Sequence, residues 1–122
     1  MADSSATLHE AADKLGPEVV DRHRAIVSLM EELEAVDWYD QRVHATDDPS
    51  LAAVLAHNRD EEKEHAIMTL EWLRRHDPIL DQHMRTYLFT DKAITEVEVE
   101  AEAADGPGGG DGSLGLGKLG RS

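Results

Sequence analysis

The chain has 122 residues, no cysteine and a formal charge of −14. Its length suggests one domain, and the lack of cysteine excludes disulfides, thiolate metal sites and cysteine nucleophiles. The negative charge argues against nucleic-acid binding and favours cations as partners, because an acidic surface concentrates them. No stretch of about 18 apolar residues could span a membrane. The first residues lack the basic start and apolar run of a signal peptide, so we expect a soluble cytoplasmic protein.

Two long helices are predicted first. Residues 1–16 form a mixed, polar N-terminal segment that we expect to be partly ordered. Pro17 suits the first turn of a helix, and no Gly or Pro interrupts the chain from there to about Ala45. Apolar residues recur at helical spacing in this stretch, namely Val19, Val20, Ile26, Val27, Met30, Leu33 and Val36. A second helix is expected from about Pro49 to Arg75, with Asp48 or Thr46 as its N-cap.

The short connection predicts that these helices lie antiparallel as a hairpin. A shorter third helix should cover about Pro78 to Phe89, and residues 91–101 could continue as a weak helix or fray. We therefore assign residues 17–101 to one all-α domain. Residues 102–122 differ, because the run Gly106–Gly112 has the composition of a flexible linker and a short glycine-leucine tail follows it. That tail is either a tethered binding peptide or a frayed terminus.

Two long amphipathic helices cannot bury both of their apolar faces alone. Four-helix bundles solve this problem by packing two hairpins together. The simplest completion here is a homodimer about a two-fold axis.

The residues that carry chemistry are Glu32 on the first helix and the pair Glu62 and His65 on the second. Glu62 and His65 lie within about 60° of each other on one helix face, which is the Glu-x-x-His spacing of di-iron carboxylate bundles. Iron accepts both hard oxygen ligands and imidazole. Glu32 and Glu62 emerge within largely apolar faces, where an unpaired carboxylate is costly. One chain supplies half of the ligand set of a di-iron bundle, so two chains would complete it. The alternative is that Glu32 pairs with an Arg or a hydroxyl in the core.

Further candidates lie close to this set. Tyr39 is within about 20° of Glu32, one layer along the helix, and could ligate iron, bond to a ligand or shuttle an electron. It could equally be a core tyrosine with a satisfied hydroxyl. Two further sets of residues could bind cations or guide them inward. They are Glu31, Glu34 and Trp38 on the first helix and His57, Glu61 and Glu64 on the second. The alternative interpretation is that each set belongs to a solvated charged face. Glu61, Lys63 and Glu64, and likewise Arg59 and Asp60, are more typical of surface ion pairs than of ligands.

Several stretches resemble the encapsulated ferritin family over about residues 18–90. They are His23-Arg-Ala-Ile-Val-Ser, Glu31-Glu-Leu-Glu-Ala-Val-Asp-Trp-Tyr-Asp-Gln-Arg, Leu55-Ala-His-Asn-Arg-Asp-Glu-Glu-Lys-Glu-His65 and Thr69-Leu-Glu-Trp-Leu-Arg-Arg. The resemblance implies a ferritin-like fold, a dimer with a ferroxidase centre at its interface, and a ring-shaped decamer of five dimers.

The family's centre matches Glu32, Glu62 and His65, with Tyr39 close by. Its accessory sites, and those where cations enter, match Glu31, Glu34, Trp38, His57, Glu61 and Glu64, and calcium or other divalent cations could occupy them. The tail Gly112-Ser-Leu-Gly-Leu-Gly-Lys-Leu119 resembles the cargo-loading peptides of encapsulin shells. The resemblance thus implies a bacterial cytoplasmic protein held inside an encapsulin nanocompartment through residues 112–121.

The sequence therefore predicts a ferroxidase that oxidises Fe(II), with dioxygen or peroxide as acceptor, and delivers iron for storage in a shell. Two alternatives remain. One is a metal-binding dimer without redox activity, and the other is a helical scaffold whose purpose is recruitment to a shell.

Overall fold

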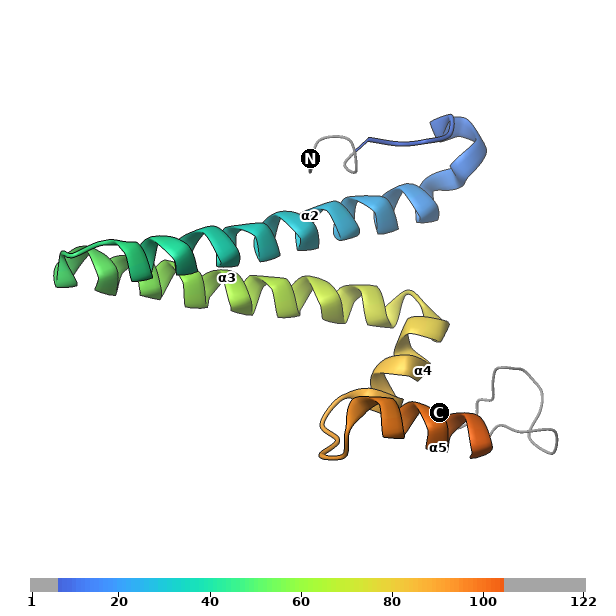
Figure 1. Cartoon of the computed structure of the whole chain (residues 1–122). Coiled ribbons are helices and arrows are strands. Elements are labelled where there is room, and N and C mark those ends of the chain that lie inside the picture. The colour runs from blue at the N-terminus through green and yellow to red at the C-terminus, as the bar shows by residue number, and fades with distance from the viewer. Residues whose placement is uncertain (1–6, 105–122) are drawn as a thin grey trace. The chain divides into compact units, whose positions relative to one another are not determined.

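The computed structural model describes residues 7–104, and these residues form helices without any strand. The helices are α2 (Ala12–Ala45), α3 (Pro49–Arg75), α4 (Pro78–Tyr87) and α5 (Ile94–Ala104), as Figure 1 shows. Helices α2 and α3 run antiparallel in one compact unit that ends at His76, and α4 and α5 belong to a second unit that begins at Asp77. The predicted all-α hairpin is confirmed. None of the helices within residues 7–104 has the length and apolarity needed to cross a membrane.

Helix α2 starts earlier than the sequence predicted because it consists of two helical pieces joined at Gly16. At this residue φ is 83° and ψ is 161°, a combination that is essentially restricted to glycine. Regular helix resumes at Pro17, which needs no N–H donor in a first turn. The predicted start at Pro17 is thus the start of the long, uninterrupted part of α2.

The turn between α2 and α3 is fixed by two side chains. The Asp48 carboxylate accepts a hydrogen bond of 3.0 Å from the backbone N–H of Ser50, which makes Asp48 the N-cap of α3. The hydroxyl of Thr46 accepts a 3.2 Å hydrogen bond from the N–H of Asp48. Both candidate residues therefore take part, but only Asp48 caps the helix, and Pro49 follows it in the first turn.

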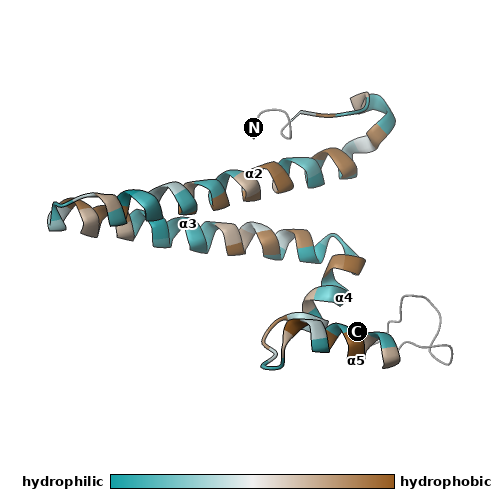
Figure 2. Ribbon diagram, viewed as in Figure 1, coloured by the Kyte–Doolittle hydropathy of each residue, from teal (hydrophilic) through white to brown (hydrophobic). Residues whose placement is uncertain are grey.

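The hairpin buries little of its apolar surface. Among its described residues only Ala66 and Leu73 are buried, at 3% and 5% exposure. Hydrophobic residues recur along both helices (Figure 2). Those with large side chains that remain exposed include Val19, Ile26, Leu33, Trp38, Leu51, Val54, Ile67, Met68 and Trp72. So many exposed large apolar residues on one hairpin favour an interaction face.

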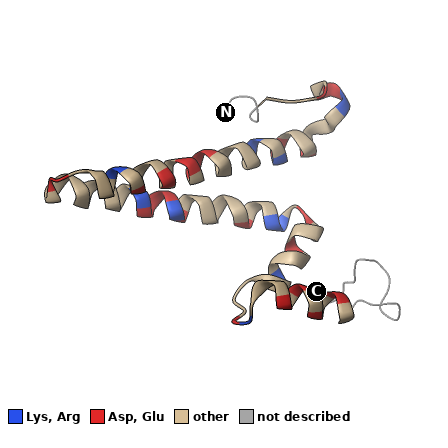
Figure 3. Cartoon of the chain, viewed as in Figure 1, with Lys and Arg blue, Asp and Glu red and all other residues tan. Residues whose placement is uncertain are grey.

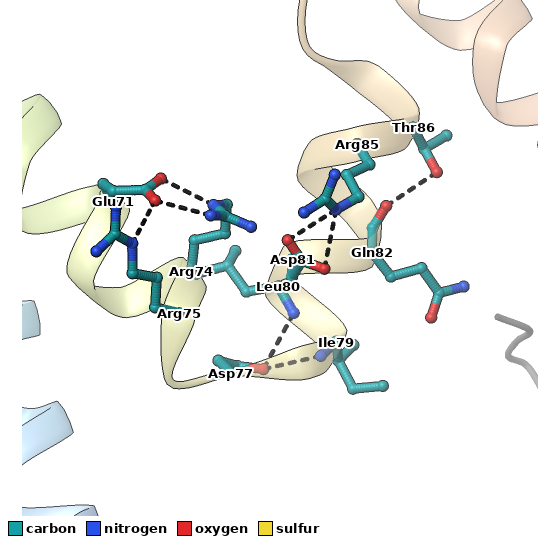
Figure 4. A network of polar contacts seen from close by, with 10 residues as sticks. All are labelled: Glu71, Arg74, Arg75, Asp77, Ile79, Leu80, Asp81, Gln82, Arg85 and Thr86. Carbon is teal, nitrogen blue, oxygen red and sulfur yellow. Dashed lines mark hydrogen bonds and ion pairs between the residues drawn. The ribbon is translucent and has the colours of Figure 1, made fainter. Parts of the chain in front are cut away.

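A network of charged side chains lies at the C-terminal end of α3 (Figure 4). The Glu71 carboxylate accepts hydrogen bonds of 2.8 and 2.7 Å from Arg74 and one of 2.7 Å from Arg75. These bonds, first those from Arg74 and then that from Arg75, lower the pKa of Glu71 to about 2. Positive charge at this position also complements the negative end of the helix dipole.

The second unit differs in detail from the prediction. The Asp77 carboxylate caps α4 by accepting from the N–H groups of Ile79 and Leu80 (Figure 4). Helix α4 ends at Tyr87, two residues before the predicted end, because Leu88 is extended and Phe89 has a φ of 63°. The stretch that could have frayed forms α5, which buries Val97. Burial, and then the charges of Glu98 and Glu102, raise the pKa of Tyr87.

The capping role of Asp48 leads to a stability prediction. Replacing Asp48 by Ala removes the acceptor for the Ser50 N–H and should lower the free energy of unfolding by about 1 kcal/mol. Urea unfolding followed by circular dichroism at one fixed protein concentration measures this change. Asp47→Ala is the matched control, because Asp47 is the exposed neighbour that does not cap the helix. Equal losses in the two variants would contradict the assignment.

The Glu71 network leads to a prediction about pH. The carboxylate carbon of Glu71 should titrate in an NMR experiment near pH 2, well below the ordinary 4.5. Because the folded pKa is depressed, the stabilisation from this group is complete above about pH 4.5 and is lost as pH falls toward 2. Arg74→Ala should raise the midpoint more than Arg75→Ala does. A midpoint unchanged by either substitution would show that the arginines do not hold this carboxylate.

Candidate metal centre

The hairpin places Glu32 and Glu62 at the same height. Each lies fifteen residues from Asp47, the middle residue of the turn, one on α2 and the other on α3. At 1.5 Å per residue both are about 22 Å from the turn. Acidic residues are frequent on both helices in this part of the hairpin (Figure 3). The fold therefore brings the two predicted carboxylates to one level.

Glu32 is in an unusual position for a charged side chain. The residue is half-buried, and its Oε1 atom is shielded from solvent without any hydrogen-bond partner. An unsatisfied buried acceptor costs about 1–3 kcal/mol. The alternative in which Glu32 pairs with an Arg or a hydroxyl leaves this oxygen unexplained within one chain. A bound cation would satisfy it.

Glu62 and His65 lie side by side on α3. The distance from His65 Nδ1 to Glu62 Oε1 is 3.8 Å, and that from His65 Nε2 to Glu61 Oε1 is 4.0 Å. The side chain of Glu62 is 28% exposed and that of His65 is 48% exposed. A neutral imidazole ring can bind a metal through either nitrogen. The pair is accessible enough to receive ligands or a partner surface.

A single chain does not complete a metal site. Within residues 7–104, no three His, Asp or Glu side chains of one chain come together in a way that could hold an ion. The structure brings Glu62 and His65 together and sets Glu32 at their level. Carboxylate oxygens with one imidazole suit iron, and the unpartnered Glu32 oxygen fits that ligand set. The missing ligands would have to come from another chain.

Tyr39 is half-buried on α2, and the guanidinium carbon of Arg42 lies 5.7 Å from the centre of its ring. This distance permits a cation–π contact. The contact involves the ring face of Tyr39 and not its hydroxyl group.

The six accessory candidates remain near the surface. Glu31 and Trp38 are exposed on α2, whereas Glu34 is half-buried. On α3, His57, Glu61 and Glu64 are all exposed. Glu61 approaches His65, and Trp38 lines a shallow pocket with Gln41 and Arg42. Such positions suit both weak cation sites and a solvated charged face.

An ion pair across the hairpin escaped sequence reasoning. Arg59 contacts Asp60 as predicted, with Nε 3.1 Å from Oδ1, but its Nη1 atom also lies 2.8 Å from Oδ1 of Asp40 on α2. Lys63, which was predicted to belong to a surface ion pair in the run with Glu61 and Glu64, lies 3.3 Å from Asp60, three residues earlier on α3. Only the register of the hairpin could have indicated the contact with Asp40.

These contacts change the titration of the groups involved. Hydrogen bonds from Arg59, and then from Lys63, lower the pKa of Asp60. The hydrogen bonds that Arg59 donates, first to Asp60 and then to Asp40, raise the pKa of Arg59. Both shifts favour the charged forms of Asp60 and Arg59.

The chain is similar to a known protein family, to several named proteins and to a solved structure. Residues 7–91 match the family model described as EncFtn-like. An encapsulated ferritin-like protein of Rhodospirillum rubrum is 67% identical over 98 residues, which cover 80% of this chain and 70% of the relative. An encapsulin nanocompartment cargo protein of Myxococcus xanthus is 33% identical over 69 residues, covering 57% and 53% of the two chains. The crystal structure of a protein from Nitrosomonas europaea superposes on this chain with a TM-score of 0.69 and a sequence identity of 60%. The match covers 71% of this chain and 96% of that one.

The buried oxygen of Glu32 leads to a prediction for the metal-free protein. Glu32→Met removes an unsatisfied acceptor and should raise the free energy of unfolding by about 1 kcal/mol. Added Co(II), as a redox-stable probe, should stabilise the wild-type protein but not the variant. Chemical denaturation with and without the metal measures both effects. Glu31→Met is the matched control, since Glu31 is the exposed neighbour, and a similar response of both variants would remove the special status of Glu32.

Proposed function

This chain belongs to the EncFtn-like family, that of the encapsulated ferritin-like proteins, and from this premise we propose that it is a ferroxidase. It oxidises Fe(II) to Fe(III) at a di-iron centre formed between two protomers. Iron is the substrate of this reaction, and dioxygen or peroxide is the electron acceptor.

The observation that carries the proposal is the buried, unpartnered Oε1 atom of Glu32. A carboxylate oxygen withdrawn from water is tolerated where a cation or a donor meets it, and the described part of one chain provides neither. Glu62 and His65 offer an oxygen and a nitrogen at the same level of the hairpin. These are the ligand types that iron accepts.

The dimer follows from two separate needs. A di-iron bundle takes a Glu from each of two helices and a Glu-x-x-His pair from each of the other two, and one hairpin supplies half of this set. The same hairpin leaves large apolar side chains in water. Pairing two hairpins about a two-fold axis supplies the second half of the ligands and covers those faces.

In the proposed centre, Glu32 of each protomer bridges or shares the two irons, and each Glu62–His65 pair completes one of them. Two Fe(II) ions give one electron each. These electrons reduce dioxygen, with two protons, to hydrogen peroxide, or reduce peroxide, with two protons, to two waters. Tyr39, seven residues after Glu32 on α2, is the proposed residue for electron or proton movement.

The outer acidic residues have a separate role in the proposal. Glu31, Glu34, Glu61 and Glu64, with Trp38 and His57, draw cations toward the centre or hold them transiently. Calcium or another divalent cation could occupy these positions, since their oxygen-rich side chains suit hard cations. Most of them are exposed, as such a role requires.

Delivery of the product completes the proposal. The names of two relatives describe an encapsulated protein and a cargo of an encapsulin nanocompartment. We therefore place this protein inside such a shell in a bacterial cytoplasm, attached through residues 112–121, which lie outside the described residues. Dimers assembled into a ring of five would have no storage cavity of their own, so the shell would store the oxidised iron.

The proposal is tested by adding Fe(II) anaerobically to metal-free protein, admitting air, and following oxygen uptake and absorbance together with native mass spectrometry. Rapid oxidation should saturate near one iron per chain, in dimers or multiples of dimers. Glu32→Ala and His65→Ala should oxidise iron no faster than a protein-free solution.

Glu18→Ala serves as a control because this exposed carboxylate lies at the far end of α2. Wild-type oxidation at the protein-free rate would refute the ferroxidase. If dimers still formed under that outcome, the helices would be a scaffold for shell recruitment.

A further inference from the structure

We infer that Arg59 is a positioning residue, which bridges Asp40 of α2 and Asp60 of α3 and thereby holds Glu32 level with Glu62. This inference rests on the proposed function, because it names what sets the geometry of the proposed centre. It concerns residues that neither the ligand set nor the accessory sites include.

The bridge joins the two long helices directly. Arg59 Nη1 lies 2.8 Å from Asp40 Oδ1, and Arg59 Nε lies 3.1 Å from Asp60 Oδ1. The side chain of Arg59 is only 19% exposed, although both of its partners are about half exposed. A long side chain held at both carboxylates and largely covered has one dominant position, unlike an arginine in water.

The residue type suits this task. A guanidinium group presents several N–H donors in a rigid plane, so it can donate through different nitrogens to two carboxylates at once. An ammonium group is a point charge on a flexible stem and fixes geometry less well. Asp60 also contacts Lys63 at 3.3 Å, so two cations neutralise two carboxylates. The bridge therefore adds no net positive charge that would repel an incoming cation.

The bridge lies where it can control the centre. Arg59 precedes Glu62 by three residues, nearly one helical turn, and Asp40 directly follows Tyr39. On the other side of Glu62, Ala66 is buried in the hairpin. Glu62 is thus held between a polar contact and a packing contact.

Few apolar contacts of the hairpin are fully buried. Its buried residues are Ala66 and Leu73, and Ala66, which is nearer to Glu62, has a small side chain that fits against a neighbouring helix in more than one position. The ion pair of Arg59 with Asp40, with its one hydrogen bond between the helices, favours a single register. Sliding one helix by a turn would displace Glu62 from Glu32 by about 5.4 Å. A displacement of even about 1 Å at a reactive centre can cost about 100-fold in rate.

The test compares Asp40→Asn, which weakens the contact between the helices, with Asp60→Asn, which alters only the contact within α3. Asp40→Asn should lower the rate of Fe(II) oxidation at saturating iron on the order of ten-fold and leave the iron concentration for half-maximal rate within about two-fold. Asp60→Asn should retain most of the wild-type rate. Asp40→Glu keeps the charge and should restore part of the loss.

A second readout requires no iron. The chain lacks cysteine, so nitroxide labels can be attached at Ser28→Cys on α2 and Ala53→Cys on α3 alone. These two positions are about 20 Å apart along the hairpin axis, and their distance reports any sliding of α2 against α3. Electron spin resonance on labelled chains diluted with unlabelled protein gives the distance. Asp40→Asn should shift or broaden this distance, and Asp60→Asn should leave it as in the wild type.

The outcomes separate the two proposals. If wild-type protein oxidises no iron, the ferroxidase fails, and the spin-label distances alone decide whether Arg59 sets the register. An unchanged distance in Asp40→Asn overturns the positioning role whatever the rate does. A shifted distance with a wild-type rate also overturns it, because the register would then not govern the centre. A change confined to the half-maximal iron concentration would mean that Asp40 attracts cations instead.

Discussion

A carboxylate oxygen that is removed from water and meets no donor is unstable, and the arrangement of this protein follows from that constraint. The Oε1 atom of Glu32 is in this position within the hairpin. The side chain emerges from the middle of a long helix and is half-buried there. Residues 7–104 of one chain offer nothing that would offset this cost, and a cation is the simplest candidate.

The exposed apolar surface of the hairpin also calls for a partner. Two helices side by side have a large surface for their volume, and only Ala66 and Leu73 are buried between them. A four-helix bundle removes this surplus, whereas a single hairpin cannot. The unsatisfied oxygen and the exposed apolar faces lie on the same two helices. One association between hairpins can therefore meet both needs, and this is why the proposed centre and the proposed dimer are inseparable.

Polar contacts at the ends and in the middle of the helices keep this arrangement in place. Asp48 and Thr46 close the turn, the Glu71 network occupies the end of α3, and Arg59 links α3 to α2. The ion pairs among these contacts are partly exposed and contribute little to stability by themselves, whereas the Asp48 cap contributes about 1 kcal/mol. The turn contacts and the ion pair of Arg59 with Asp40 also add specificity, since they favour one register of the two helices over its neighbours. The Glu71 network lies within α3 and orders the end of that helix. A metal centre needs that specificity more than an apolar core does, because bond lengths to an ion tolerate little error.

The sequence alone determined the helices, because their apolar period, Pro17 and the Asp48–Pro49 cap are local signals that do not depend on distant residues. It also indicated the candidate ligands, because the spacing of Glu62 and His65 on one helix fixes their common face. It left residues 91–101 as either a weak helix or a frayed stretch, and the structure forms α5 there with Val97 buried. The isolation of the Glu32 oxygen and the contact of Arg59 with Asp40 were decided only by the tertiary structure. Both depend on which residues of α2 and α3 lie opposite each other, and that register is set by contacts between the two helices rather than by either helix alone.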